Sequence, residues 1–140
     1  MNEFQIWSTL NSGLAVNGLF LIGFSFLAWF SGRASVIMHE KGNANLFGKI
    51  VVSAFSLSSL WYINMQFSYV ALGISSASHS MAVLKEESGS ISARGQSLID
   101  FFGGSTDVPT FSRVNEPAGL ILVISIMFFF LFDSLKPLVT

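Results

Sequence analysis

The chain has 140 residues, enough for one domain, and its formal net charge of −1 argues against nucleic-acid binding through bulk positive charge. Half of the residues are apolar (51%), only 11% are charged, and the mean hydropathy is +0.63, whereas a soluble domain carries about 25% charged residues. This composition predicts an integral membrane protein. The absence of cysteine excludes disulfides, thiolate catalysis and Cys-ligated metal sites.

The first predicted helix covers residues 4–32, which contain no charged residue. Its densest apolar part is residues 14–30. A helix needs roughly 20 apolar residues to cross about 30 Å of hydrocarbon, so this run is long enough to span a membrane. We expect the surplus at residues 4–10 to lie at the interface, with Trp7 at the depth of the lipid headgroups.

A short basic turn is predicted over residues 33–49, because Gly42 and Asn43 favour turns. The first two spans would then form a helical hairpin. Lys and Arg gather on the cytoplasmic side of a membrane, so we expect the hairpin tip in the cytoplasm and the N-terminus outside. Topology control with anionic-lipid contact is the favoured role of the basic side chains; the alternative is a positive lining where many hairpins converge. The basic residues of the turn are Arg33, Lys41 and Lys49.

The second predicted helix covers residues 50–78, another uncharged run. It is longer than one perpendicular span requires. We expect one long helix with residues 50–72 in lipid. A tilted helix, an extension beyond the bilayer and a break near Asn64 are the alternatives.

A hydrophilic segment follows over residues 79–116, with an amphipathic helix predicted at residues 91–102. The sequence Ser88-Gly89-Ser90 indicates a break followed by an N-cap, and Gly103-Gly104 is a typical helix stop. The apolar side of this helix is expected to lie on the membrane surface or against a partner.

The third predicted helix covers residues 118–136, where Pro117 suits the first turn. Its uncharged part, residues 118–132, would span only roughly 22 Å, so Asp133 and Lys136 would lie near the headgroups. We expect three spans. Two spans followed by a buried or interfacial tail remain the alternative.

Small residues recur four positions apart along the predicted helices. In lipid no hydrophobic force brings helices together, so close approach through small residues drives packing. Oligomerisation through these faces and packing within one hairpin remain equally open. The residues are Ala28, Gly32, Ala54, Ser58, Ala71, Gly73, Ser75 and Ala77.

Three amides, Asn17, Asn64 and Gln66, lie inside the predicted spans. An unpaired amide is costly in hydrocarbon, so these groups should face protein or water. Hydrogen bonding within the hairpin is favoured over a pore lining or a subunit contact.

Catalytic and cofactor motifs are missing from the sequence. The two histidines, His39 and His79, lack metal-ligand spacing and are expected at the surface. Neither a G-x-S-x-G elbow nor a phosphate-binding loop is present. We therefore expect no enzyme activity and no cofactor, although bound phospholipid is compatible with such a chain.

The layout over roughly residues 14–105 resembles the small membrane subunits of conjugation and type IV secretion machines, most closely type IVB (Dot/Icm and IncI-plasmid) systems. The resemblance is carried by two apolar helices, the turn at residues 39–43 and the segment Phe101-Phe102-Gly103-Gly104-Ser105. The hairpin with a basic tip is also similar to conjugative pilins.

This resemblance implies a non-catalytic subunit of a channel, stalk or pilus in the bacterial inner membrane, or outside the cell for a pilus. Partners would be further copies or other subunits, with nucleic acid only as cargo. A phage holin-like pore former and an accessory subunit of a respiratory or transport complex are the alternatives.

Overall fold

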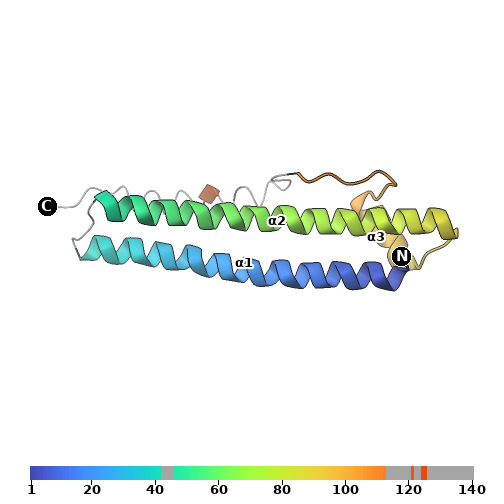
Figure 1. The fold of residues 1–140 in the computed structure, drawn as a ribbon, viewed down its shortest axis with the longest axis horizontal. Coiled ribbons are helices and arrows are strands. Elements are labelled where there is room, and N and C mark those ends of the chain that lie inside the picture. Colours follow the sequence, from blue (N-terminus) through green and yellow to red (C-terminus); the bar gives the residue numbers. More distant parts are fainter. Residues whose placement is uncertain (42–45, 113–120, 122–123, 126–140) are drawn as a thin grey trace. The chain divides into compact units, whose positions relative to one another are not determined.

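The computed structural model describes residues 1–41, 46–112, 121, 124 and 125 (Figure 1). Within these residues the chain forms three helices, α1 (Glu3–Glu40), α2 (Leu46–Ser88) and α3 (Ala93–Phe102), and no strand. The predicted all-α class is therefore confirmed for this part. With 38 and 43 residues, α1 and α2 are about 57 Å and 65 Å long, roughly twice the thickness of the hydrocarbon core.

The predicted turn over residues 33–49 is wrong at both ends, because Arg33 lies in α1 and Lys49 lies in α2. The stretch from residue 34 to residue 40 contains neither Gly nor Pro, so nothing in it stops a helix. Charge alone does not end a helix. The connection is reduced to residues 41–45, of which 42–45 lie outside the described residues.

The chain forms two compact units, each built from a part of both long helices. We call residues 1–19 and 67–112 the α3 unit, and residues 20–66 the tip unit. In the α3 unit the first half of α1, the second half of α2 and α3 enclose a small apolar core. Its buried members are Ile6, Leu10, Ala77, Met81 and Leu98.

Helix α3 is short and amphipathic, as predicted, and its ends explain its length. The Ser92 hydroxyl accepts a hydrogen bond from the Gly95 backbone N–H and caps the first turn. At the other end Gly103 adopts φ +66°, and the Gly103 and Gly104 N–H groups donate to the Ile99 carbonyl. The expected glycine stop is thus confirmed, while the helix starts two residues later than predicted.

In the tip unit the second part of α1 runs antiparallel to the first part of α2. The ring of Phe24 stacks on Tyr62 with centroids 5.0 Å apart, and Ser31 hydrogen-bonds to Ser56. The residue numbers fall on α2 as they rise on α1, as an antiparallel pair requires. The tip unit is therefore a helical hairpin.

The predicted third apolar helix at residues 118–136 lies outside the described residues, apart from positions 121, 124 and 125.

Candidate membrane and assembly interface

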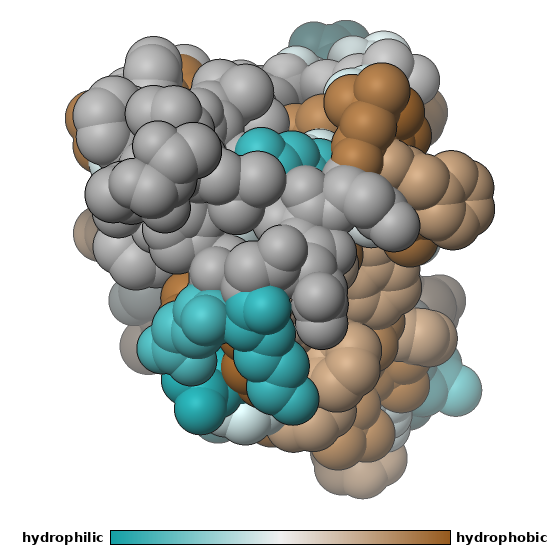
Figure 2. All heavy atoms as spheres, turned by 90° about the vertical axis from the view of Figure 1, so that its left-hand side faces the viewer, coloured by the Kyte–Doolittle hydropathy of each residue, from teal (hydrophilic) through white to brown (hydrophobic). Residues whose placement is uncertain are grey.

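Large apolar side chains of the tip unit point outward. Leu46 and Phe47, at the start of α2, are 74% and 75% exposed. In the view from the end that carries the α1–α2 connection, the coloured surface has broad hydrophobic areas and a compact hydrophilic patch (Figure 2). Other exposed apolar residues of the unit are Phe20, Ile22, Phe26, Trp29, Phe30, Ile50, Val51, Phe55, Leu57, Trp61 and Tyr62.

The interior of the same unit contains polar groups. Ser31 is 1% exposed, and its hydroxyl donates to the Ala28 carbonyl at 2.8 Å while accepting from Ser56 Oγ at 2.9 Å. Ser59 is buried as well and donates to the Phe55 carbonyl. Because these hydroxyls have partners, they are buried at little cost.

Leu60 and Ile63 are buried in the same unit, so its interior is mixed, while its outer surface is far more apolar than that of a water-soluble domain. In the most apolar 18-residue window of each long helix, only 6% of α1 and 22% of α2 is buried. A core helix of a soluble protein is mostly buried. Both helices are long and apolar enough to cross a membrane, and their outward side chains favour a membrane location.

Two of the predicted small-residue pairs lie in different environments in the structure. Ala28 is 5% exposed and Gly32 is half-buried, so this pair packs within the hairpin. Ala54 and Ser58 are exposed on α2, and the Ser58 hydroxyl donates to the Ala54 carbonyl. This second pair is available to another helix.

The other two pairs lie on the part of α2 in the α3 unit. Ala77 belongs to the apolar core and Gly73 is half-buried, so this pair faces α1. Ala71 is half-buried and Ser75 is exposed. Oligomerisation through Ala71 and Ser75 remains a prediction.

The three amides occupy different environments. The Asn17 side chain donates to the Gly13 carbonyl of its own helix at 3.0 Å. Asn64 is half-buried. Gln66 is only 8% exposed, and its Oε1 atom has no hydrogen-bond partner within the part of the chain that the structure describes. A buried acceptor left unpaired costs about 1–3 kcal/mol.

The three basic residues lie around the connection between α1 and α2. Arg33 and Lys41 are exposed, and Lys49 is half-buried in the first turn of α2. A cation in the first turn of a helix opposes the helix dipole. Helix stability therefore does not explain why a lysine stands at position 49. A role of Lys49 in membrane topology or in contact with anions is consistent with this position.

The sequence did not reveal how α3 docks on the rest of its unit. The Glu3 carboxylate accepts hydrogen bonds from the Ser92 backbone N–H at 3.1 Å and from the Ser92 hydroxyl. The Arg94 guanidinium lies 4.4 Å from the centroid of the Trp7 ring. Trp7, expected at headgroup depth, thus contacts Arg94 of the hydrophilic segment.

A close backbone contact holds the segment that follows α3. A Cβ atom on Gly104 would lie 2.9 Å from the Ser78 carbonyl oxygen, so only glycine fits. The neighbouring His79 donates from Nδ1 to the Ser105 carbonyl at 3.0 Å. His79 therefore fixes this segment. No group of three His, Asp or Glu residues in the described ranges could hold a metal ion.

Comparison of the chain with models of known protein families, with curated proteins and with solved structures finds no match. The resemblance to secretion and conjugation subunits therefore depends on its own motifs.

Proposed function

We propose that this chain is a non-catalytic integral membrane subunit that oligomerises into a conjugative DNA-transfer or type IV secretion assembly, as a channel, stalk or pilus subunit. The apolar outer surface of the tip unit is the observation that carries the proposal. Its exposed Phe, Leu, Ile and Trp side chains suit lipid, and its buried hydroxyls suit a hairpin interior.

Membrane insertion is supported by the energy of the exposed apolar surface. Transfer of one large apolar side chain out of water is worth about 1.5–3 kcal/mol. The tip unit exposes more than ten such side chains. In water a patch of this kind causes association or aggregation, whereas in lipid it carries no such penalty.

Assembly is supported by the exposed pair Ala54 and Ser58. Small residues four apart let two helix backbones approach closely in lipid. Since the Ala28–Gly32 pair is already used within the hairpin, Ala54 and Ser58 are the better candidates for contact between copies.

The choice of a secretion or conjugation machine is carried by the resemblance described above. The basic residues around the connection favour a cytoplasmic tip in the bacterial inner membrane. Nucleic acid would be cargo, without direct recognition by this subunit.

Electron microscopy of the protein purified in mild detergent, with chain mass per particle, tests the proposal. We expect rings or filaments of many copies. The double substitution A54L/S58L should yield smaller particles while membrane insertion survives. Ser25 is exposed on α1 and has no small residue four positions away, so S25L is the matched control and should assemble normally.

A monomer that co-purifies with one enzyme or transporter would overturn the proposal and identify an accessory subunit. Abrupt loss of membrane potential on controlled expression would identify a holin-like pore former.

A further inference from the structure

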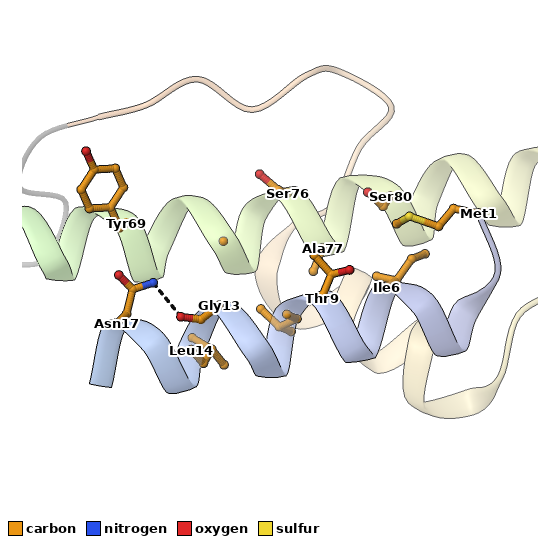
Figure 3. Close-up of a pocket in the computed structure, with 12 residues that line it drawn as sticks. Met1, Ile6, Thr9, Gly13, Leu14, Asn17, Tyr69, Ser76, Ala77 and Ser80 are labelled. Carbon is orange, nitrogen blue, oxygen red and sulfur yellow. Dashed lines mark hydrogen bonds between the residues drawn. The ribbon is translucent and has the colours of Figure 1, made fainter. Parts of the chain in front are cut away.

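Within the α3 unit, α1 and α2 leave a slot of about 230 Å³ between them (Figure 3). Its walls are mainly apolar, with Ile6, Leu10 and Leu14 from α1 and Ala77 from α2. No charged side chain lines it.

Two glycines keep this slot open. Gly13 on α1 and Gly73 on α2 both line it, and a Cβ atom built on either would meet no heavy atom within 4 Å. Such glycines usually allow two helices to touch. Here the space is unfilled, so the lining atoms lack contacts. An apolar guest would supply them.

The shape of the slot favours an extended alkyl chain over a compact ligand. On α1 the lining extends from Ile6 to Asn17, and on α2 from Tyr69 to Ser80, a length of about 16 Å on each helix. An apolar cavity of about 150 Å³ holds benzene, so at the same volume per carbon about 230 Å³ holds roughly nine carbons.

The polar groups lie where a lipid could use them. Thr9, Ser76 and Ser80, which carry hydroxyls, are among the lining residues, and hydroxyls can donate to ester or phosphate oxygens. Val16 and Leu19 of the same unit are 52% and 71% exposed. The slot therefore lies on a unit whose outer surface also suits hydrocarbon.

We infer that the slot binds one alkyl chain of a membrane phospholipid. This inference rests on the proposed membrane location. A free fatty acid offers the same hydrocarbon chain, so the test must separate the two sources.

The test fills the slot with side chains. The double substitution G13L/G73L places apolar groups in open space, and leucine favours a helix over glycine. Gly18 and Gly23 also have open space around a Cβ atom but do not line the slot. The variant G18L/G23L is therefore the matched control.

Each protein is purified from membranes in mild detergent, and the extracted lipids are counted by mass spectrometry. We expect the wild type and G18L/G23L to retain one phospholipid per chain more than G13L/G73L. Equal retention by all three overturns the inference, and so does retention of fatty acid in place of phospholipid.

A second measurement distinguishes a loss of lipid binding from misfolding of the variant. After delipidation, addition of dioleoyl phosphatidylglycerol should raise the Tm of the wild type and the control. The G13L/G73L variant, whose slot is filled, should keep its helical circular dichroism signal and show no rise in Tm. A rise equal to that of the wild type overturns the inference while leaving membrane insertion intact. Wild-type protein found in the soluble fraction instead overturns the proposed function.

Discussion

The two units use the same pair of helices differently. The α3 unit encloses an apolar core that includes Ile6 and Met81, whereas the tip unit buries the hydroxyls of Ser31 and Ser56 beside Leu60 and exposes most of its aromatic side chains. Buried polar groups therefore form a larger share of the interior in the tip unit. Hydroxyls in a protein surrounded by lipid must find partners inside the protein, so this interior suits a hairpin whose outer surface is apolar.

The largest expected effect lies in the α3 unit. Met81 is fully buried in its core, so Met81→Ala should lower the free energy of unfolding of this unit by about 2–5 kcal/mol. Thermal denaturation followed by Trp fluorescence measures the loss. Val51→Ala in the tip unit removes an exposed side chain and serves as the control. An equal loss of unfolding free energy in both variants would contradict the difference between a buried apolar core and an exposed apolar surface.

The contact between Gly104 and Ser78 should give the next largest effect. Gly104→Ala forces the segment after α3 away from α2, because the new Cβ would overlap the Ser78 backbone. We expect a loss of about 1–3 kcal/mol and faster proteolysis after α3. Gly23→Ala, in open space, should leave the cleavage rate unchanged. An unchanged rate in Gly104→Ala would show that the contact is not needed.

A smaller effect is expected for the polar interior of the tip unit. Ser56→Ala removes the hydrogen bond to Ser31, and such bonds between membrane helices are worth about 0.6 kcal/mol on average. Unfolding of the reconstituted protein by a denaturing detergent measures this loss of stability. Ser25, exposed on α1 of the same unit, is the control in Ser25→Ala. A larger loss in the control would refute the assigned interior.

The smallest effect concerns the contact between Arg94 and Trp7. A cation over an exposed ring is worth about 0.5–1 kcal/mol. Arg94→Ala should therefore speed amide hydrogen exchange in α3 by only a few fold, and Arg94→Lys should retain part of the protection. Exchange in α1 at Phe24, which lies in the tip unit, should not change. Full loss of α3 protection would mean that this contact alone holds the helix.

The sequence predicted the helix types well because the signals are local. Long uncharged runs predicted the two apolar helices, and Gly103-Gly104 predicted the end of α3. The predicted turn is too long because basic residues do not end a helix, and residues 34–40 contain no glycine or proline.

The buried faces could not be predicted. Apolar residues surround both long helices, so no stripe marked the side that faces the partner helix. The sequence also does not reveal that Glu3 hydrogen-bonds to Ser92, because the two residues are 89 positions apart. The small-residue pattern was correctly noticed, but only the structure separates Ala28 inside the hairpin from Ala54 outside it.

Whether the apolar outer surface of the tip unit faces lipid is tested most directly by cysteine accessibility, since the chain contains no cysteine of its own. Single cysteines would replace the exposed residues Phe26 and Leu57 of the tip unit and Ser97 of α3. Membrane fragments open on both sides would be treated with a water-soluble maleimide. We expect rapid labelling at Ser97, and labelling at Phe26 and Leu57 only after detergent is added. Equally rapid labelling at all three positions before detergent would contradict this expectation.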